Sequence, residues 1–165
     1  MNEYSAFRTR GVRTEFKVYL EALALVERLH RLLLDVIKDE FERLGILEIN
    51  AVQALLLFNI GEQEVTAGEL KSRGYYQGSN VSYNLKKLVE LGYMHHQRCD
   101  ADRRSVRVKL TSKGRDVRQT LEHLFNAHSE KMQKVDGLSE STITTLTQTL
   151  KELERFWTLQ IRYIY

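Results

Sequence analysis

Residues 66–115 read TAGELKSRGYYQGSNVSYNLKKLVELGYMHHQRCDADRRSVRVKLTSKGR and carry the capping and turn signals that decide the fold. Thr66-Ala67-Gly68-Glu69 is a capping box, which predicts a short helix from Thr66 to about Arg73. Gly74 breaks that helix. A second helix is predicted from about Ser79 to Leu91, because apolar residues recur there at helical spacing. Two helices joined by a tight turn are typical of a helix-turn-helix.

Two strands are predicted after this helix pair. Residues 93–98 and 105–110 alternate in character, as strands with one buried face do, and the charged tip 99–104 joins them. Glu64 and Val65 are placed to add a short third strand. The order of helix, turn, helix and β-hairpin predicts a winged helix-turn-helix.

Positive charge is concentrated in the same stretch. From Lys71 to Arg115 there are eleven Lys and Arg residues against three acids, a local net charge of +8. The whole chain is only +3, so the remaining residues sum to −5. A basic, turn-rich module on a neutral-to-acidic scaffold indicates a protein that binds duplex DNA.

Composition excludes several other classes of protein. No apolar run approaches the roughly 20 residues that span a membrane, and the first residues lack the apolar core of a secretory signal. The single cysteine, Cys99, cannot form an internal disulfide and fits a reducing cytoplasm. The absence of proline permits long uninterrupted helices.

Long helices are predicted on both sides of the winged helix. From Thr14 to Leu44 apolar residues recur every three or four positions, a spacing that keeps one stripe on one face of a helix. From Ile143 to Trp157 the spacing resembles a coiled-coil seam. A helix of about 45 Å exceeds a small domain core, so part of its stripe is expected to lie on a second subunit.

The predicted fold class is mainly α with a small β-wing, an α+β arrangement. Asn50-Ala51-Val52-Gln53 resembles a capping box and predicts a helix over residues 51–59. These residues are apolar on nearly all sides, so this helix is expected at the buried centre. Residues 1–13 are polar and are expected to form a flexible arm, which either touches phosphates or is simply disordered. The expected organisation is an arm at 1–13, an N-terminal dimerisation helix at 14–47, a winged helix-turn-helix DNA-binding domain at 48–112 and C-terminal dimerisation helices at 113–165.

Residues 102–114, DRRSVRVKLTSKG, resemble the wing signature of the MarR family. The family pattern is an Asp-Arg-Arg wing, an alternating strand, and Leu-Thr-x-x-Gly at the start of the next helix. Residues 79–93 are similar to the family's recognition helix and its exit. The resemblance implies a cytoplasmic transcriptional regulator, a homodimer that binds double-stranded DNA at a pseudo-palindromic site. It also implies a small-molecule effector that alters affinity.

Residues 74–88, GYYQGSNVSYNLKKL, resemble a narrower branch that is linked to L,D-transpeptidase expression and osmotic stress. Two positions depart from the family pattern. Ala101 stands where an arginine is common, which leaves Arg103 as the expected wing contact. Asn84 stands where an apolar residue is common, which predicts either unusual packing or a base contact.

The predicted recognition helix enters the major groove with its N-terminus first. Short polar side chains there allow close approach, and an amide such as Asn80 can pair with adenine. For each residue a phosphate contact or a local cap is the alternative. The wing arginines are candidates for the minor groove, one of them pairing with Asp102. The candidate DNA-binding residues are Gln77, Ser79, Asn80, Ser82, Tyr83, Asn84, Lys86, Lys87, Asp102, Arg103 and Arg104.

Other chemistry finds little support in the sequence. No nucleophile elbow, P-loop, dinucleotide fingerprint or zinc-protease motif is present, so no enzyme activity, cofactor or metal is expected. Cys99 is interpreted as a small packing residue rather than a redox switch. An effector pocket is expected where the first helix, the second helix and the helix after the wing converge, near His30 and Phe58. The alternative function is a helical protein-interaction scaffold that binds no specific DNA.

Overall fold

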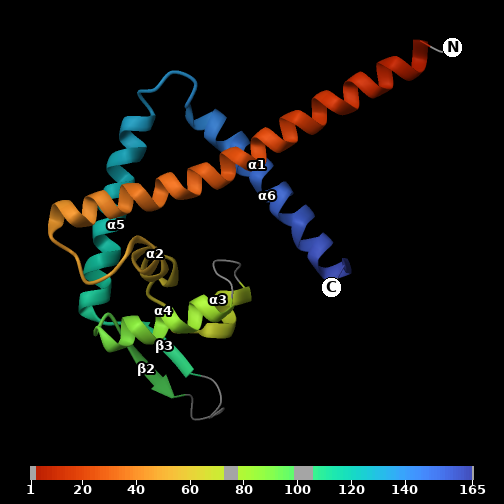
Figure 1. Ribbon diagram of the computed structural model, residues 1–165. Coiled ribbons are helices and arrows are strands. Elements are labelled where there is room, and N and C mark those ends of the chain that lie inside the picture. The colour runs from red at the N-terminus through yellow and green to blue at the C-terminus, as the bar shows by residue number, and fades with distance from the viewer. Residues whose placement is uncertain (1–2, 73–77, 99–105, 165) are drawn as a thin grey trace. The chain divides into compact units, whose positions relative to one another are not determined.

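The computed structural model describes residues 3–72, 78–98 and 106–164 (Figure 1). It divides the chain into two compact units, Met1–Leu121 and Glu122–Tyr165. Helix α5 crosses the boundary between them. The predicted class, mainly α with a small antiparallel sheet, is confirmed. In chain order the elements are α1 (Glu3–Leu44), α2 (Ala51–Ile60), β1 (Val65–Thr66), α3 (Ala67–Ser72), α4 (Gly78–Glu90), β2 (Met94–Arg98), β3 (Val106–Leu110), α5 (Ser112–Met132) and α6 (Glu140–Ile164).

The sheet is the wing predicted from the alternating runs. Its strand order is β1-β3-β2, and both pairings are antiparallel. Val65 pairs with Val108 and Met94 pairs with Leu110, and all four side chains are buried. Opposed residues of an antiparallel pair lie on the same face, so these four form the inner face of the sheet.

The core of the first unit gathers around α2, as its apolar sequence predicted. Leu56, Leu57 and Ile60 of α2 are almost completely buried. Two side chains from the end of α1, Ile37 and Phe41, are buried as well. Apart from the four residues of the sheet, the other buried apolar residues of this unit lie in α2, α3, α4, α5 and the connecting segments: Ala54, Leu70, Val81, Leu85, Leu88, Val117, Leu121, Ile49 and Tyr93.

Two capping boxes define the starts of α2 and α3. The Asn50 side chain accepts from the Gln53 backbone N–H at 2.9 Å, and the Gln53 side chain accepts from the Asn50 backbone N–H at 3.1 Å. The Thr66 hydroxyl accepts from the Glu69 N–H at 3.1 Å, and the Glu69 carboxylate accepts from the Thr66 N–H at 2.6 Å. Both helix starts were predicted from these residues.

One boundary predicted from the sequence is wrong. Helix α1 begins at Glu3, not near Thr14, so the expected flexible arm at 1–13 is helical over its described part. The segment contains no proline, and alanine, glutamate and arginine favour a helix. A helix that already runs from Thr14 extends N-terminally without a new nucleation step.

Helices α1 and α6 both carry exposed apolar side chains. The α6 start is capped by Ser139, whose hydroxyl accepts from the Thr142 N–H at 3.3 Å. Among the described residues, no helix combines the length and the apolar character that a membrane crossing requires. Large exposed apolar side chains on α1 are Phe16, Val18, Tyr19, Leu20, Leu25, Val26, Leu29, Leu32, Val36 and Leu44, and on α6 Leu146, Leu150, Phe156, Trp157, Leu159 and Ile161.

Candidate nucleic-acid interface

Helix α4 has one buried face and one polar face. Val81, Leu85 and Leu88 attach it to the core of the first unit. Ser82, Tyr83 and Lys86 are exposed, and the Tyr83 side chain is 67% accessible. Lys87 and Asn84 are half-buried at the edge between the two faces. Five of the eleven predicted DNA-binding residues, Ser82, Tyr83, Asn84, Lys86 and Lys87, therefore have described side chains on this one helix.

The other six predicted DNA-binding residues have no described side chain. Ser79 and Asn80 lie in the first turn of α4, but only their backbone is described. Gln77 and the wing residues Asp102, Arg103 and Arg104 lie outside the described residues. Their roles stay predictions.

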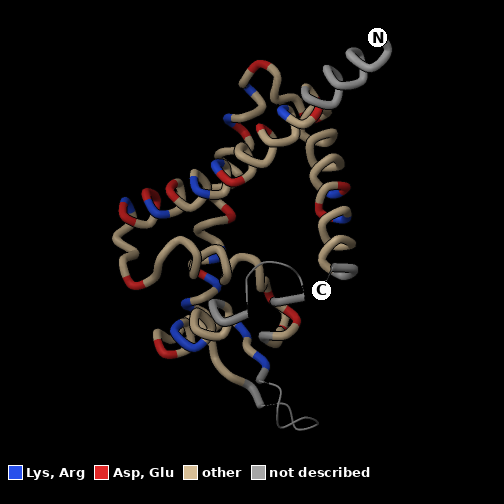
Figure 2. The backbone as a smooth tube through the Cα atoms, turned by 45° about the vertical axis from the view of Figure 1, so that its right-hand side comes forward, with Lys and Arg blue, Asp and Glu red and all other residues tan. Residues whose placement is uncertain are grey.

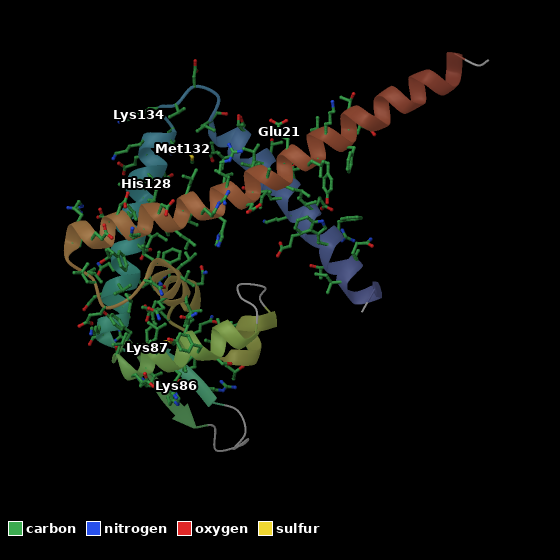
Figure 3. The ribbon with its side chains drawn as sticks, in the orientation of Figure 1. Glu21, Lys86, Lys87, His128, Met132 and Lys134 are labelled. Atoms are coloured by element: carbon green, nitrogen blue, oxygen red, sulfur yellow. The ribbon has the colours of Figure 1, made fainter. Side chains whose placement is uncertain are left out.

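The two lysines of α4 share one acid, and Figure 3 labels both of them on this helix. Lys86 Nζ lies 4.0 Å from the Glu90 carboxylate, and Lys87 Nζ lies 3.9 Å from it. The Lys86 side chain is 79% exposed and the Lys87 side chain 45% exposed. Surface ion pairs with N–O distances near 4 Å contribute little to stability. Both ammonium groups can therefore reorient toward a phosphate at a small cost in free energy.

Asn84 makes a specific contact with helix α2. The Gln53 side-chain amide donates to Asn84 Oδ1 at 3.2 Å. Gln53 is only 6% exposed and is the one buried polar side chain recorded for the described residues. Sequence reasoning noted Gln53 as a helix cap and Asn84 as a departure from the family, but nothing in the sequence paired them.

The exit of α4 is fixed by the motif that begins α5. Thr111 donates through its hydroxyl to the Gly92 carbonyl at 2.7 Å and through its backbone N–H to the Tyr93 carbonyl at 3.1 Å. The same hydroxyl accepts from the Gly114 N–H at 3.2 Å and so caps α5. A Cβ on Gly114 would meet the Tyr93 carbonyl oxygen at 2.2 Å. The Leu-Thr-x-x-Gly pattern is therefore a packing requirement between α5 and the exit of α4.

A polar cluster of Glu48, Tyr93 and Lys113 joins three segments of the first unit. Lys113 Nζ donates to the Glu48 carboxylate at 2.6 Å and to the Leu91 carbonyl at 3.2 Å. The Tyr93 hydroxyl donates to the same carboxylate at 3.0 Å, and Lys113 Nζ lies 4.2 Å from the centre of the Tyr93 ring. The cluster thus ties the α1–α2 connection to the end of α4 and the start of α5.

The cluster shifts the titration of its members. Hydrogen bonds from Lys113 and then from Tyr93 lower the pKa of the Glu48 carboxyl. The hydrogen bond to Glu48 raises the pKa of Lys113. Burial raises the pKa of Tyr93, and its hydrogen bond to Glu48 adds to that shift. The carboxylate and the ammonium are therefore held in their charged forms at neutral pH.

Cations counted along the sequence are partly neutralised in space. Lys113 pairs with Glu48, and Lys109 on the wing lies 3.6 Å from Glu64. Both acids lie outside the stretch that gave a local charge of +8. Figure 2 shows acids and bases interspersed along α1. The positive charge available to DNA is therefore smaller than the sequence count indicates.

Comparison with known proteins identifies the family. A family described as "Winged helix DNA-binding domain" matches residues 49–114. The exopolysaccharide II synthesis transcriptional activator ExpG of Rhizobium meliloti is 34% identical over 145 residues, which cover 88% of this chain and 74% of ExpG. The chain belongs to the winged helix transcriptional regulators. These relatives are regulators of transcription and not enzymes, as the sequence predicted.

Solved structures show that this regulator has the fold of the MarR proteins. The transcriptional regulator SlyA matches with a TM-score of 0.73 and 21% identity, over 87% of this chain and 99% of SlyA. Streptococcus pneumoniae FabT in complex with DNA matches with a TM-score of 0.67 and 23% identity, over 85% and 97% of the two chains. A MarR mutant from E. coli complexed with operator DNA matches with a TM-score of 0.65 and 21% identity, over 84% and 96%.

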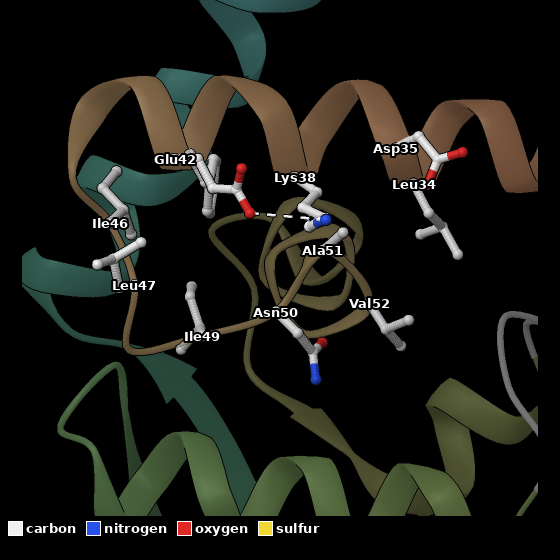
Figure 4. Close-up of a pocket in the computed structure, with 11 residues that line it drawn as sticks. Leu34, Asp35, Lys38, Glu42, Ile46, Leu47, Ile49, Asn50, Ala51 and Val52 are labelled. Carbon is white, nitrogen blue, oxygen red and sulfur yellow. Dashed lines mark ion pairs between the residues drawn. The ribbon is translucent and has the colours of Figure 1, made fainter.

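The winged helix regulator has a cavity of about 360 Å³ in its first unit (Figure 4). The end of α1, the α1–α2 connection and the start of α2 form its walls. Apolar side chains such as Phe41 and Ile49 line it, and so do Lys38 and Glu42, which form an ion pair at 3.6 Å. The sequence predicted a pocket near His30 and Phe58, and neither residue lines this cavity. Helix α5, also expected in the pocket wall, contributes no lining residue.

Within the described ranges, no three His, Cys, Asp or Glu side chains are grouped as a metal ion requires. Cys99 lies outside those ranges. The interpretation of Cys99 as a packing residue stays a prediction.

Proposed function

We propose that this regulator binds a pseudo-palindromic DNA operator as a homodimer, with residues 14–47 and 113–165 forming the dimer and residues 48–112 binding DNA. The observation that carries the proposal is the apolar stripe of α1. Phe16 and Leu29 are about 60% exposed, whereas the core of the winged helix is closed. A second copy that covers this stripe would place two recognition helices on one duplex, about 34 Å apart for half-sites one helical turn apart.

Each copy would read one half-site with α4. The helix N-terminus, with Gln77, Ser79 and Asn80, approaches the base edges, where an amide can pair with adenine. Ser82, Tyr83, Lys86 and Lys87 contact phosphates beside the groove, which supplies most of the affinity and the salt dependence. Arg103 or Arg104 enters the minor groove, and the other arginine pairs with Asp102 and keeps the shape of the wing.

A small molecule would act through the cavity at the α1–α2 connection. The cavity is large enough for a small organic ligand, and its walls join the proposed dimer helix to the helix beneath the recognition helix. A ligand changes DNA affinity only if it binds the two DNA-binding arrangements differently. The proposal therefore requires an effector whose affinity differs between the free and the DNA-bound dimer.

Two relationships guide the choice of target promoters. ExpG is an activator of transcription, and we propose the same direction for this cytoplasmic regulator. Residues 74–88 resemble a branch that is linked to L,D-transpeptidase expression. We therefore propose a cell-wall promoter as a second target. Footprinting on the gene's own promoter and on such promoters, followed by a reporter assay, tests both.

The proposal is tested by sedimentation and by fluorescence anisotropy with a footprinted duplex. We expect a dimer at micromolar concentration and specific binding that weakens steeply with salt. Arg103→Ala should weaken binding to all duplexes and reduce the salt slope by about one unit. A monomer that ignores duplexes at low salt would contradict the proposal and would favour the interaction scaffold.

A further inference from the structure

We propose that Asn84 is a positioning residue of the recognition helix, which Gln53 holds in the orientation that reads DNA. The inference rests on the proposed operator binding. It assigns Asn84 a role different from the base contact considered on sequence grounds. The proposal is based on the hydrogen bond that Gln53 Nε2 donates to Asn84 Oδ1 at 3.2 Å.

Both polar atoms of the Gln53 side-chain amide form hydrogen bonds within the first unit. Its Oε1 accepts from the Asn50 backbone N–H at 3.1 Å, and its Nε2 donates to Asn84. The Gln53 side chain is 6% exposed, so water does not replace either bond readily. The capping box of α2 therefore fixes one end of the Gln53 side chain, and the other end fixes Asn84.

The contact lies where it can set the rotation of α4. Asn84 is near the middle of Gly78–Glu90, at the edge between the buried face and the polar face. The apolar contacts of Leu85 and Leu88 have no preferred direction, so they tolerate small rotations of the helix. A hydrogen bond weakens steeply away from its preferred angle. The Gln53–Asn84 bond therefore determines where Ser82, Tyr83 and Lys86 point.

The same bond disfavours direct base reading by Asn84. An asparagine that pairs with adenine uses its carbonyl oxygen and its amino group together. In this structure the carbonyl oxygen accepts from Gln53 of helix α2, so the amide has to share that oxygen or leave this bond in order to pair with a base. Positioning requires only an acceptor at residue 84, whereas adenine reading requires an acceptor and a donor. The two roles are separated by a substitution that keeps the acceptor alone.

The experiment compares Asn84→Asp with Asn84→Leu. Aspartate keeps an oxygen acceptor for Gln53 and lacks the amino group. Leucine removes both and deprives the buried Gln53 Nε2 donor of its partner at residue 84. The measurement is the ratio of affinities for the footprinted operator and for operators with single base-pair changes. We expect Asp to weaken binding to all duplexes by a similar factor, through its charge, and to leave the ratios unchanged. Leu should lower the ratios at several positions by about tenfold.

Hydrogen exchange of α4, measured without DNA, is the second readout. We expect Asn84→Leu to accelerate exchange in α4 and Asn84→Asp to leave it close to wild type. If Asp loses discrimination at one base pair as Leu does, Asn84 reads a base and the inference is wrong. Ratios and exchange that are unchanged in the Leu variant would overturn it equally. If the wild-type protein shows no sequence preference, the proposed function is wrong. Hydrogen exchange of α4 alone then tests whether Asn84 positions this helix.

Discussion

Helices α1 and α4 are both amphipathic, but they leave opposite faces uncovered. In α4 the apolar face is closed by the same chain, with Val81 and Leu88 fully buried, and the polar face remains exposed. In α1 the chain buries Ile37 and Phe41 near the C-terminal end and leaves much of the remaining apolar stripe exposed. One helix thus presents polar groups and the other presents hydrocarbon.

The difference separates two kinds of interface. A polar face on a closed core suits a partner that is itself polar and charged, and it does not need that partner to fold. An exposed stripe of large apolar side chains costs free energy in water, since each side chain gains about 1.5–3 kcal/mol when it is buried. The winged helix should therefore be stable within one chain, whereas α1 should depend on a second.

Substitutions in the two regions should differ in their dependence on protein concentration. Leu57→Ala empties a site in the closed core and should lower the free energy of unfolding by about 2–5 kcal/mol at every concentration. Leu29→Ala, at a position 59% exposed, should cost less than about 0.5 kcal/mol in the monomer. In the dimer its cost should be larger and should grow with protein concentration.

Urea unfolding at two concentrations, about a hundredfold apart, measures both effects. Tyr83→Ala is the control for Leu29→Ala, because Tyr83 is 67% exposed and lies on α4, outside the residues proposed to form the dimer. If Leu29→Ala behaves like Tyr83→Ala at high concentration, the α1 stripe is not a subunit interface.

The features that the sequence predicted are those set by neighbouring residues. Each capping box of α2 and α3 spans four residues, and the apolar period of α4 is complete within one helix. Wing strands show their inner and outer faces through alternation alone. These signals are local, so they can be recognised in the sequence without knowledge of the rest of the fold.

The features that the sequence did not predict join distant residues. Gln53 and Asn84 are 31 positions apart, and Glu48 and Lys113 are 65 positions apart. No period or motif pairs such residues, since their contact depends on how α2, α4 and α5 pack. For the same reason the sequence count overestimated the positive charge available to DNA, because an acid that is distant in sequence can pair with a lysine in space.

Gly114→Ala tests the packing of the winged helix, the region whose apolar core is buried within one chain. The new Cβ would lie 2.2 Å from the Tyr93 carbonyl oxygen, so α5 must move away from the exit of α4. We expect a loss of about 1–3 kcal/mol, independent of protein concentration. Thermal unfolding of Gly114→Ala beside Gly68→Ala provides the control, because a Cβ at Gly68 meets its nearest atom at 3.8 Å. Equal stability of the two variants would show that the close approach is relieved at no cost.

Glu48→Gln should have a smaller effect that depends on pH. The pKa of Glu48 is lower in the folded protein than in the unfolded chain, so its contribution to stability is present above about pH 4.3 and is lost as pH falls through the folded pKa. Glutamine does not titrate. The stability difference between wild type and Glu48→Gln should therefore be largest near neutral pH and shrink in acid. A difference that stays constant from pH 7 to pH 3 would contradict a charged Glu48–Lys113 pair.

Glu90→Gln should have the smallest effect, and it acts on the polar face of α4. Glu90 holds the ammonium groups of Lys86 and Lys87 within about 4 Å, and a phosphate must compete with it. Removing this charge should raise affinity for any duplex about two- to fivefold at low salt and leave the ratio between operators unchanged. Anisotropy with the operator and a scrambled duplex measures this, and Glu62→Gln, which pairs with Arg118 outside α4, is the control. A gain restricted to the operator would mean that Lys86 or Lys87 reads bases, whereas no gain would place both lysines away from the duplex.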